Sequence, residues 1–233
     1  MSERTFDDFD GVADQYRQIH TQNVKISGAD SYYFAEMKVR LLQAYEKNTS
    51  LTILDVGCGD GSTALYMQQY FPQWKVVGID VSEKSIAVAQ SRALPNAQFL
   101  TYDGNAIPFK DKQFDLIFIA GVLHHIAFHL HAALMIEMKR VLKPHGSLYL
   151  FEHNPLNPLT RYLVNTCVFD KDAKLLPYKY TQQLIMAEGF ESIQLHFIIF
   201  FPRKGFFKPF LAVEKYLQWL PLGGQYWIKA IKP

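Results

Sequence analysis

The sequence predicts an α/β protein built on a doubly wound, mostly parallel sheet. From residue 51 onward, short apolar runs alternate with amphipathic stretches of helical periodicity. The apolar runs lack strict alternation, which is typical of strands buried on both faces. Alternating strands and helices imply parallel strands joined by right-handed crossovers. The chain has 233 residues, of which 49% are hydrophobic, so one domain with a single core is expected.

Five strands and three helices are expected in the central part of the chain. The strands are residues 51–56, 75–80, 97–101, 114–120 and 147–151, and the helices are residues 62–70, 83–92 and 129–142. Apolar residues at helical spacing also predict a helix over residues 30–47, after a looser helical region at residues 6–16.

The regular alternation of predicted strands and helices ends after residue 151. Residues 153–178 are rich in Pro, Asn and Lys and show no long periodic run. Residues 181–188 are expected to be a helix that ends at Gly189. A strand over residues 191–201, an aromatic amphipathic helix over 206–220 and a last strand over 225–231 complete the expected elements.

Composition limits which kinds of partner and which cellular compartment we expect. The formal net charge is +2, and without a basic stripe we expect no nucleic-acid partner. Cys58 and Cys167 are too few for a disulfide framework or a four-cysteine zinc site. The acidic first ten residues lack an apolar signal core, and residues 193–201 are too short to cross a bilayer. We therefore expect a cytoplasmic protein.

A glycine-rich turn, Asp55 to Gly61, follows the first predicted strand and opens onto a helix. Glycines allow a ligand to approach the backbone closely, and a helix N-terminus offers free N–H groups. Asp80 ends the second predicted strand, and an acid there can accept both hydroxyls of a ribose. The turn predicts a nucleotide-like ligand, although a tight turn without any ligand has the same local pattern.

The acids of this turn discriminate between cofactors. The spacing is G-x-G-x-G, and Asp55 stands two residues before Gly57. A carboxylate here would repel a pyrophosphate but attract a cofactor that carries an ammonium and a sulfonium group. Asp60 adds a second negative charge. These residues favour S-adenosylmethionine over a nicotinamide dinucleotide.

The chain resembles the class I S-adenosylmethionine-dependent methyltransferases, in particular the group that includes the ubiquinone and menaquinone C-methyltransferases. The matching motifs are ILDVGCGDG (53–61), VVGIDVSEKSI (76–86), FLTYDGNAIPF (99–109), FDLIFIAGVLHHI (114–126) and RVLKPHGSLYL (140–150). The resemblance implies a Rossmann-like sheet of seven strands with the last strand antiparallel. It also implies a helical cap over residues 1–50, a cofactor-binding core over 51–151 and a substrate-covering part over 152–233.

The resemblance further implies a cofactor site. Asp55, Gly57 and Gly59 would hold the methionine end, with Cys58 as a small residue of the same loop. The other expected contacts are Asp80 for the ribose, Val81 for the adenine, Asp103 with Gly104 for the adenine amino group, and Ala120 for the methionine moiety. Tyr16 in the N-terminal region would cap the cofactor from the opposite side, and the expected product is S-adenosylhomocysteine.

Candidate catalytic residues come from the carboxyl edge of the sheet, where such folds bind ligands. His124 and His153 follow two successive predicted strands, and Arg161 could clamp a carboxylate or phosphate of the substrate. The alternative for residues 152–161 is an ordinary solvated loop. His125 could be catalytic or purely structural. The four-residue spacing of His125 and His129 could place both on one helix face, as at a metal site, but no cysteine or acid stands at a matching spacing, so we expect surface histidines here and at His131.

The sequence leaves the methyl acceptor open. The expected substrate is a small molecule: a quinone or lipid-like ring, a sugar or another metabolite. The alternative is a non-catalytic S-adenosylmethionine-binding regulatory or partner protein. The predicted helix 206–220 would face the core or cover the substrate, with contact to a membrane or lipid-linked substrate as the second interpretation.

Overall fold

A computed structural model describes residues 31–167, 173–203 and 205–233, and these residues contain one seven-stranded sheet in the order β3-β2-β1-β4-β5-β7-β6. The strands are β1 (Thr52–Val56), β2 (Lys75–Asp80), β3 (Ala97–Thr101), β4 (Phe114–Ala120), β5 (Leu142–His153), β6 (Glu191–Ile198) and β7 (Gln225–Ile231). Strands β1 to β5 pair in parallel, whereas β7 is antiparallel to both β5 and β6. The predicted doubly wound sheet with an antiparallel last strand is confirmed.

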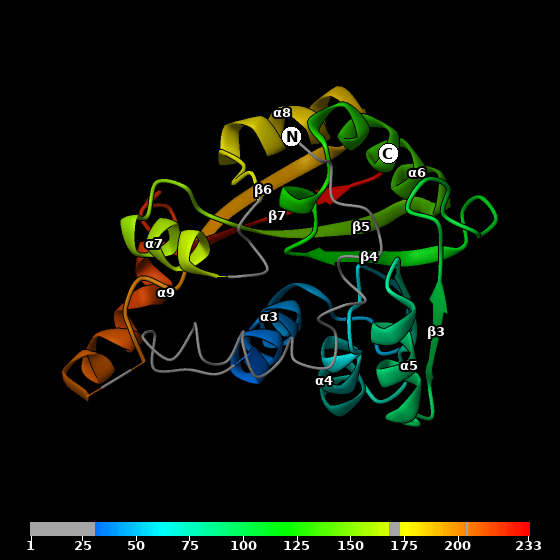
Figure 1. Ribbon diagram of the computed structural model, residues 1–233, viewed down its shortest axis with the longest axis horizontal. Helices are drawn as coiled ribbons and strands as arrows, with labels where there is room; N and C mark the ends of the chain where they lie inside the picture. The colour runs from blue at the N-terminus through cyan, green and yellow to red at the C-terminus, as the bar shows by residue number, and fades with distance from the viewer. Residues whose placement is uncertain (1–30, 168–172, 204) are drawn as a thin grey trace.

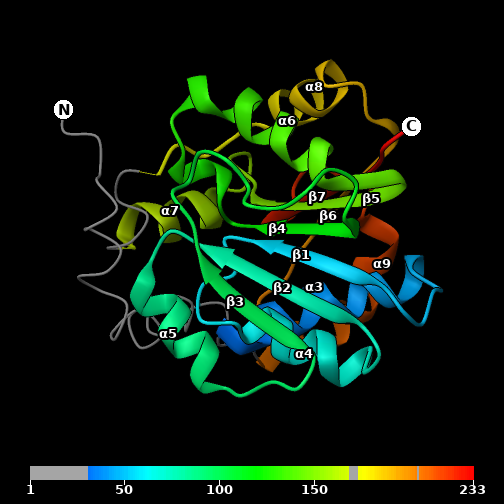
Figure 2. The same ribbon diagram turned by 90° about the vertical axis from the view of Figure 1, so that its right-hand side faces the viewer.

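Helices cover both faces of this sheet (Figures 1 and 2). On one face lie α3 (Ser31–Tyr45), α4 (Ser62–Tyr70) and α5 (Glu83–Ser91), and on the other lie α6 (His131–Val141) and α8 (Tyr178–Ala187). Adjacent residues of β1 show why both faces are apolar. Ile53 packs into the core on the side of α3 and α4, and Leu54 packs into the core on the side of α6, because successive strand residues point to opposite faces.

The region after β5 contains a helix that the sequence pattern did not indicate, α7 (Pro158–Thr166). Asn157 caps its first turn, since its side chain accepts a hydrogen bond from the Thr160 amide at 2.9 Å. Pro158 occupies the first turn, where its missing N–H costs nothing. Asn154 is fully buried and donates to the carbonyls of Pro221 and Gly223, so this loop is fastened to the connection before β7.

The predicted aromatic helix over residues 206–220 is wrong in type and in orientation. The chain forms a 3-10 helix, η4 (Gly205–Val213), followed by the short α9 (Glu214–Leu217). Pro209 lies inside η4, and proline cannot supply the amide that a longer α-helix would use there. Neither helix has a buried residue, so the expectation of a core-facing helix is wrong as well.

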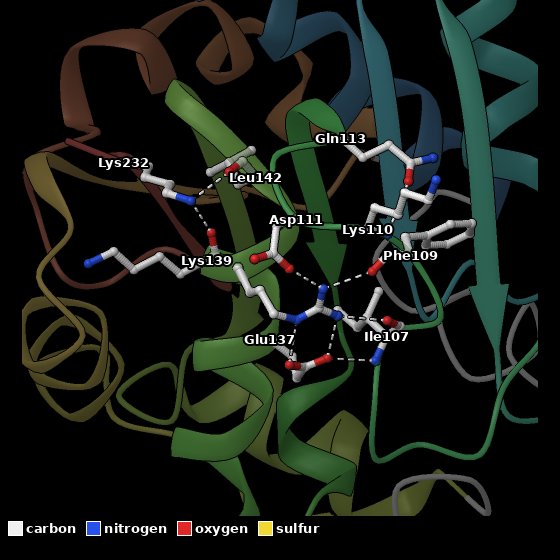
Figure 3. A network of polar contacts seen from close by, with 10 residues as sticks. Ile107, Phe109, Lys110, Asp111, Gln113, Glu137, Lys139, Leu142 and Lys232 are labelled. Carbon is white, nitrogen blue, oxygen red and sulfur yellow. Dashed lines mark hydrogen bonds and ion pairs between the residues drawn. The ribbon is translucent and has the colours of Figure 1, made fainter.

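A polar network holds the loop between β3 and β4 against α6 (Figure 3). The guanidinium of Arg140 donates to the carbonyls of Ile107 and Phe109 and pairs with Asp111 and Glu137 at 2.8 Å. Glu137 also accepts from the Ile107 amide. This network fixes the loop that begins at Asp103, near the carboxyl ends of β1 and β2.

The predicted helical region at residues 6–16 and the Asp30 cap lie outside the described residues. Within the described parts of the chain, no helix has the length and apolarity needed to cross a membrane.

Candidate functional site

The glycine turn between β1 and α4 has the backbone conformation that the sequence pattern predicted. Gly57, Gly59 and Gly61 have φ angles of 70°, 52° and 75°, a region that residues with a side chain rarely adopt. A Cβ on Gly57 would lie 2.3 Å from Cγ2 of Val122, whereas a Cβ on Gly59 would meet nothing within 4 Å. Backbone is therefore exposed to an approaching ligand at Gly59.

Asp80, at the carboxyl end of β2, faces this turn. One of its carboxylate oxygens accepts from the Gly59 amide at 2.8 Å, and the other accepts from the Ser82 amide at 3.0 Å. The backbone of the turn and of residue 82 therefore orients the Asp80 carboxylate.

Asp55 and Lys38 form a pair of desolvated opposite charges beside the turn. Asp55 is 2% exposed, and burial together with the nearby Asp80 raises its pKa to about 7. Burial lowers the pKa of Lys38 to about 8, against the opposing effect of Glu152 and Asp55. Oδ2 of Asp55 has no hydrogen-bond partner among the described residues. The amino-acid end of S-adenosylmethionine, with its ammonium and carboxylate, fits this arrangement.

Asp60 is engaged in holding the turn. Its carboxylate forms an ion pair with Arg92 at 2.6 Å, and Arg92 also donates to the Asp60 carbonyl. The predicted second negative charge of the loop is therefore balanced by a residue at the end of α5, which the local sequence pattern did not indicate.

The other predicted cofactor contacts are distributed around the same edge. Cys58 is buried, and burial raises the pKa of its thiol well above the ordinary value, which is consistent with a packing residue. Asp103 is exposed and accepts from the amides of Asn105 and Ala106. Val81, Gly104 and Ala120 are partly buried. Tyr16 lies outside the described residues.

A buried histidine–carboxylate pair stands at the ends of β4 and β5. Nδ1 of His124 lies 2.6 Å from Oε2 of Glu152, and the Leu123 amide donates to Oε1. Burial raises the pKa of Glu152, but the imidazoles of His124, His153 and His125 outweigh burial and hold it below its ordinary value. An ionised Glu152 can only accept, so Nδ1 of His124 carries a hydrogen.

A cavity of about 260 Å³ lies beside the His124–Glu152 pair, and the residues of the glycine turn and Asp80 are not among those that line it. His124, Glu152 and His153 line it together with Lys38 and Ala120, and the His153 ring centroid lies 5.2 Å from that of His124. Much of the remaining wall is apolar and comes from α3, β5, α7 and the segment after β6, namely Phe34, Phe151, Leu159, Leu163, Val164, Ile199, Phe200 and Phe201. Two predicted catalytic residues thus meet in one cavity.

Arg161, the third predicted catalytic residue, is exposed on α7 and does not line this cavity. The arginine that does line it is Arg203, which pairs with Glu214 at 2.8 Å. Sequence reasoning did not single out Arg203, Glu152 or Gln225, another lining residue. Only Glu152 had a local signal, because it ends a predicted strand at the same edge as His153.

The histidines considered for a metal site separate in the structure. His129 is exposed, whereas His131 is buried. The ring of His131 contacts the Tyr180 hydroxyl at 2.9 Å and the carbonyl of Leu123 at 3.0 Å. Among the residues that the structure describes, no group of three or more His, Cys, Asp or Glu side chains could hold a metal ion.

Comparison with known proteins agrees with this geometry. Residues 53–146 match the family model described as a methyltransferase domain. The chain is 27% identical over 149 residues to a demethylmenaquinone methyltransferase of Thermotoga maritima, covering 64% of this chain and 61% of the relative. It is 31% identical over 156 residues to the protein of that name from Chlorobaculum parvum, covering 66% and 62%. The chain thus matches less than two thirds of each relative's length.

A similar fold occurs in a solved structure from Thermotoga maritima, an S-adenosylmethionine-dependent methyltransferase described as a possible histamine N-methyltransferase. The TM-score is 0.71 at 18% identity, and the superposition covers 98% of this chain and 99% of that one. Residues 53–146 thus match a methyltransferase domain in sequence, and the described chain shares the seven-stranded fold of that S-adenosylmethionine-dependent methyltransferase.

Proposed function

We propose that this protein transfers a methyl group from S-adenosylmethionine to a small-molecule acceptor with an apolar body, bound in the cavity beside His124. The observation that carries the proposal is that one cavity is lined both by Lys38, whose charge acts on Asp55, and by the His124–Glu152 pair. Ligands of such folds bind at this edge of the sheet.

The cofactor would be held through both of its ends. Asp55 is suited to the ammonium group and Lys38 to the carboxylate. Both side chains are desolvated, so each would be stabilised by an opposite charge of the cofactor. Asp80 would accept the ribose hydroxyls, with the adenine between Val81 and the Asp103–Gly104 turn. The backbone of Gly57 and Gly59 would lie against the methionine moiety, near Ala120. When bound, the cofactor supplies an electrophilic methyl group on a sulfonium.

The protein's own contribution to the reaction would be alignment, desolvation and proton removal. Glu152 holds Nδ1–H of His124, which leaves Nε2 as the nitrogen that takes a proton from the acceptor. His153 lies beside it and is suited to a hydrogen bond with the same acceptor group. We propose His124 as the base and His153 as a residue that orients the acceptor.

The acceptor class follows from the cavity wall. Aromatic rings from three segments line it, including Phe34, Phe200 and Phe201, and such surfaces favour a flat or lipid-like apolar body. The names of the relatives, demethylmenaquinone methyltransferases, support a hydroxylated ring of the quinol type. We propose that residues 152–233 of this single domain supply most of the acceptor side, together with Phe34 and His124, and that residues 51–151 supply most of the cofactor side, together with Lys38.

The test has two stages. Titration calorimetry with S-adenosylmethionine measures cofactor binding, and mass spectrometry then follows a 14-dalton gain, the mass of one added methylene, on short-chain quinols, phenols and hydrophilic amines. Cofactor binding with methylation of the quinols or phenols is the expected result. Methylation of amines alone would overturn the acceptor class. Cofactor binding without methylation of any of these compounds would favour the non-catalytic alternative.

A further inference from the structure

The segment from Gly205 to Leu222 presents an apolar surface that neither the core nor the cavity uses. No residue of η4 or α9 is buried, and none of residues 205–222 lines the cavity. Phe206, Trp219 and Tyr216 are 79%, 73% and 68% exposed. In Figure 1 this orange segment projects from the body of the molecule, below α7.

Six of the seven exposed large apolar residues of this segment recur at every third position. The side chains of this series are all exposed to solvent, and they are Phe207, Phe210, Val213, Tyr216, Trp219 and Leu222. In a 3-10 helix, residues three apart lie above one another, so Phe207, Phe210 and Val213 form one stripe along η4. The spacing therefore gathers exposed apolar side chains into one surface. Such a surface marks a site of interaction with a partner.

The segment is anchored firmly at its base. Glu214 accepts hydrogen bonds from the amides of Phe200 and Phe201 and pairs with Arg203. The carbonyl of Gln218 accepts from the amide of Phe197 in the edge strand β6. These bonds hold the segment as a platform, with its apolar side chains outward.

The platform also continues into the cavity wall. Phe201 lines the cavity and packs against Phe210 and Phe207, with ring centroids 5.5 and 6.5 Å apart. The exposed stripe and the acceptor side of the cavity therefore share one aromatic cluster. A molecule that leaves an apolar phase at the stripe meets the cavity wall next.

The charges on the segment identify the partner. The only acidic residue of 205–222 is Glu214, which is already paired with Arg203, whereas Lys208 and Lys215 are exposed. Self-association about a two-fold axis would bring equal positive charges together. An anionic lipid surface attracts them, accepts Phe side chains, and suits the amphipathic rings of Tyr216 and Trp219 at its interface.

We infer that the Gly205–Leu222 segment docks onto the surface of an anionic lipid bilayer. The consequence that the cavity receives a lipid-borne acceptor rests on the proposed function, whereas the docking does not. Binding to lipid and binding to S-adenosylmethionine are therefore measured separately on the same full-length protein.

Trp219 provides a direct readout. The chain has three tryptophans, and Trp74 and Trp227 are fully buried. Vesicles of phosphatidylcholine mixed with phosphatidylglycerol should shift the tryptophan emission to shorter wavelength and protect it from an aqueous quencher. Trp219→Phe should abolish this response. Emission unchanged by vesicles at low ionic strength would overturn the inference.

Flotation with the same vesicles tests which residues dock. The double variant Phe206→Ser/Phe210→Ser should remain with the unbound protein, and Lys208→Gln/Lys215→Gln should bind about 25-fold more weakly, roughly fivefold for each lysine. The matched controls Met186→Ser and Lys75→Gln/Lys110→Gln, exposed on other elements, should float like the wild type.

Two further outcomes would overturn the inference. One is equal flotation of the wild type and the Phe206→Ser/Phe210→Ser variant. The other is a wild-type dimer in analytical ultracentrifugation that becomes monomeric in that variant, which would make a second copy the occupant. Calorimetry with S-adenosylmethionine should give the same affinity for every variant, so loss of cofactor binding in the wild type counts against the proposed function alone.

Discussion

Replacing Asp55 by Asn should change the stability of the ligand-free protein and its affinity for S-adenosylmethionine in opposite directions. Asp55 is buried, and its pKa is raised from 3.8 to about 7, mainly by desolvation. Asn has nearly the same shape and carries no charge, so the variant removes the cost of the buried charge and, with it, the counter-charge of the ammonium group.

The size of the stability change depends on pH. Because the folded protein binds the Asp55 proton more tightly than the unfolded chain does, the free energy of unfolding falls as pH rises from about 4 to 7. A shift of this size amounts to about 4 kcal/mol once the pH exceeds the raised pKa. This figure already includes the opposing attraction to Lys38, so we expect Asp55→Asn to be more stable by about 2–4 kcal/mol at pH 8.

Thermal unfolding at two pH values measures this effect. For a chain of this length, about 2–4 °C of melting temperature corresponds to each kcal/mol, so the gain should be roughly 4–16 °C at pH 8. At pH 5 the difference should be about a third as large, because the carboxyl of the unfolded chain has ionised while that of the folded protein is still protonated. Calorimetry at pH 8 should show affinity for S-adenosylmethionine weakened by about 10- to 100-fold, the worth of one charge-assisted hydrogen bond.

Asp115, a carboxylate away from the glycine turn, serves as the control. Asp115 accepts from the Thr52 amide at 2.8 Å and pairs with Lys143 at 2.7 Å. Asp115→Asn should lower the melting temperature and leave the cofactor affinity unchanged. The reasoning about Asp55 is refuted if Asp55→Asn is no more stable than the wild type at pH 8, or if it binds the cofactor equally well.

Three further predictions concern the turn and the acceptor side. His124→Asn, which keeps a donor toward Glu152, should lower kcat by about 100-fold or more on an acceptor that must lose a proton, with the calorimetric affinity for S-adenosylmethionine unchanged; an unaltered kcat would exclude His124 as the base. Gly57→Ala should lower the free energy of unfolding by about 1–3 kcal/mol in denaturant titrations, since the new Cβ meets Val122 at a positive φ, and adding Val122→Ala should restore part of it unless backbone strain is the whole cause. Arg161→Ala should leave kcat/KM unchanged because the side chain lies outside the cavity, so a large loss would return Arg161 to the site.

The local motifs were predictable because their geometry depends on neighbours in the chain. The positive φ angles of Gly57 and Gly59 and the position of Asp80 after β2 follow from a strand, a tight turn and a helix in succession. Helix α7 was missed although Asn157-Pro158 is a recognisable start signal, because the residues after it lack a long apolar period.

Residues brought together across the sheet were less predictable. Lys38 on α3 comes near Asp55 and Glu152, which lie on β1 and β5. Arg92 reaches back to Asp60, and Arg203 replaces Arg161 at the cavity. Each contact joins segments far apart in the chain, and a single sequence carries no pattern that pairs them.

By itself, the sequence determined the alternation of strands and helices, the glycine turn and the acid at the end of β2, because these depend on periodicity and on short-range backbone limits. Only the tertiary structure decided that His124 has Glu152 as its partner, that Arg161 stands outside the cavity, and that the aromatic segment after Gly205 faces outward. The physical reason is that burial and charge pairing are set by which distant segments pack together. A proline-containing 3-10 helix anchored by Glu214 cannot turn the same residues toward the core as a regular α-helix would.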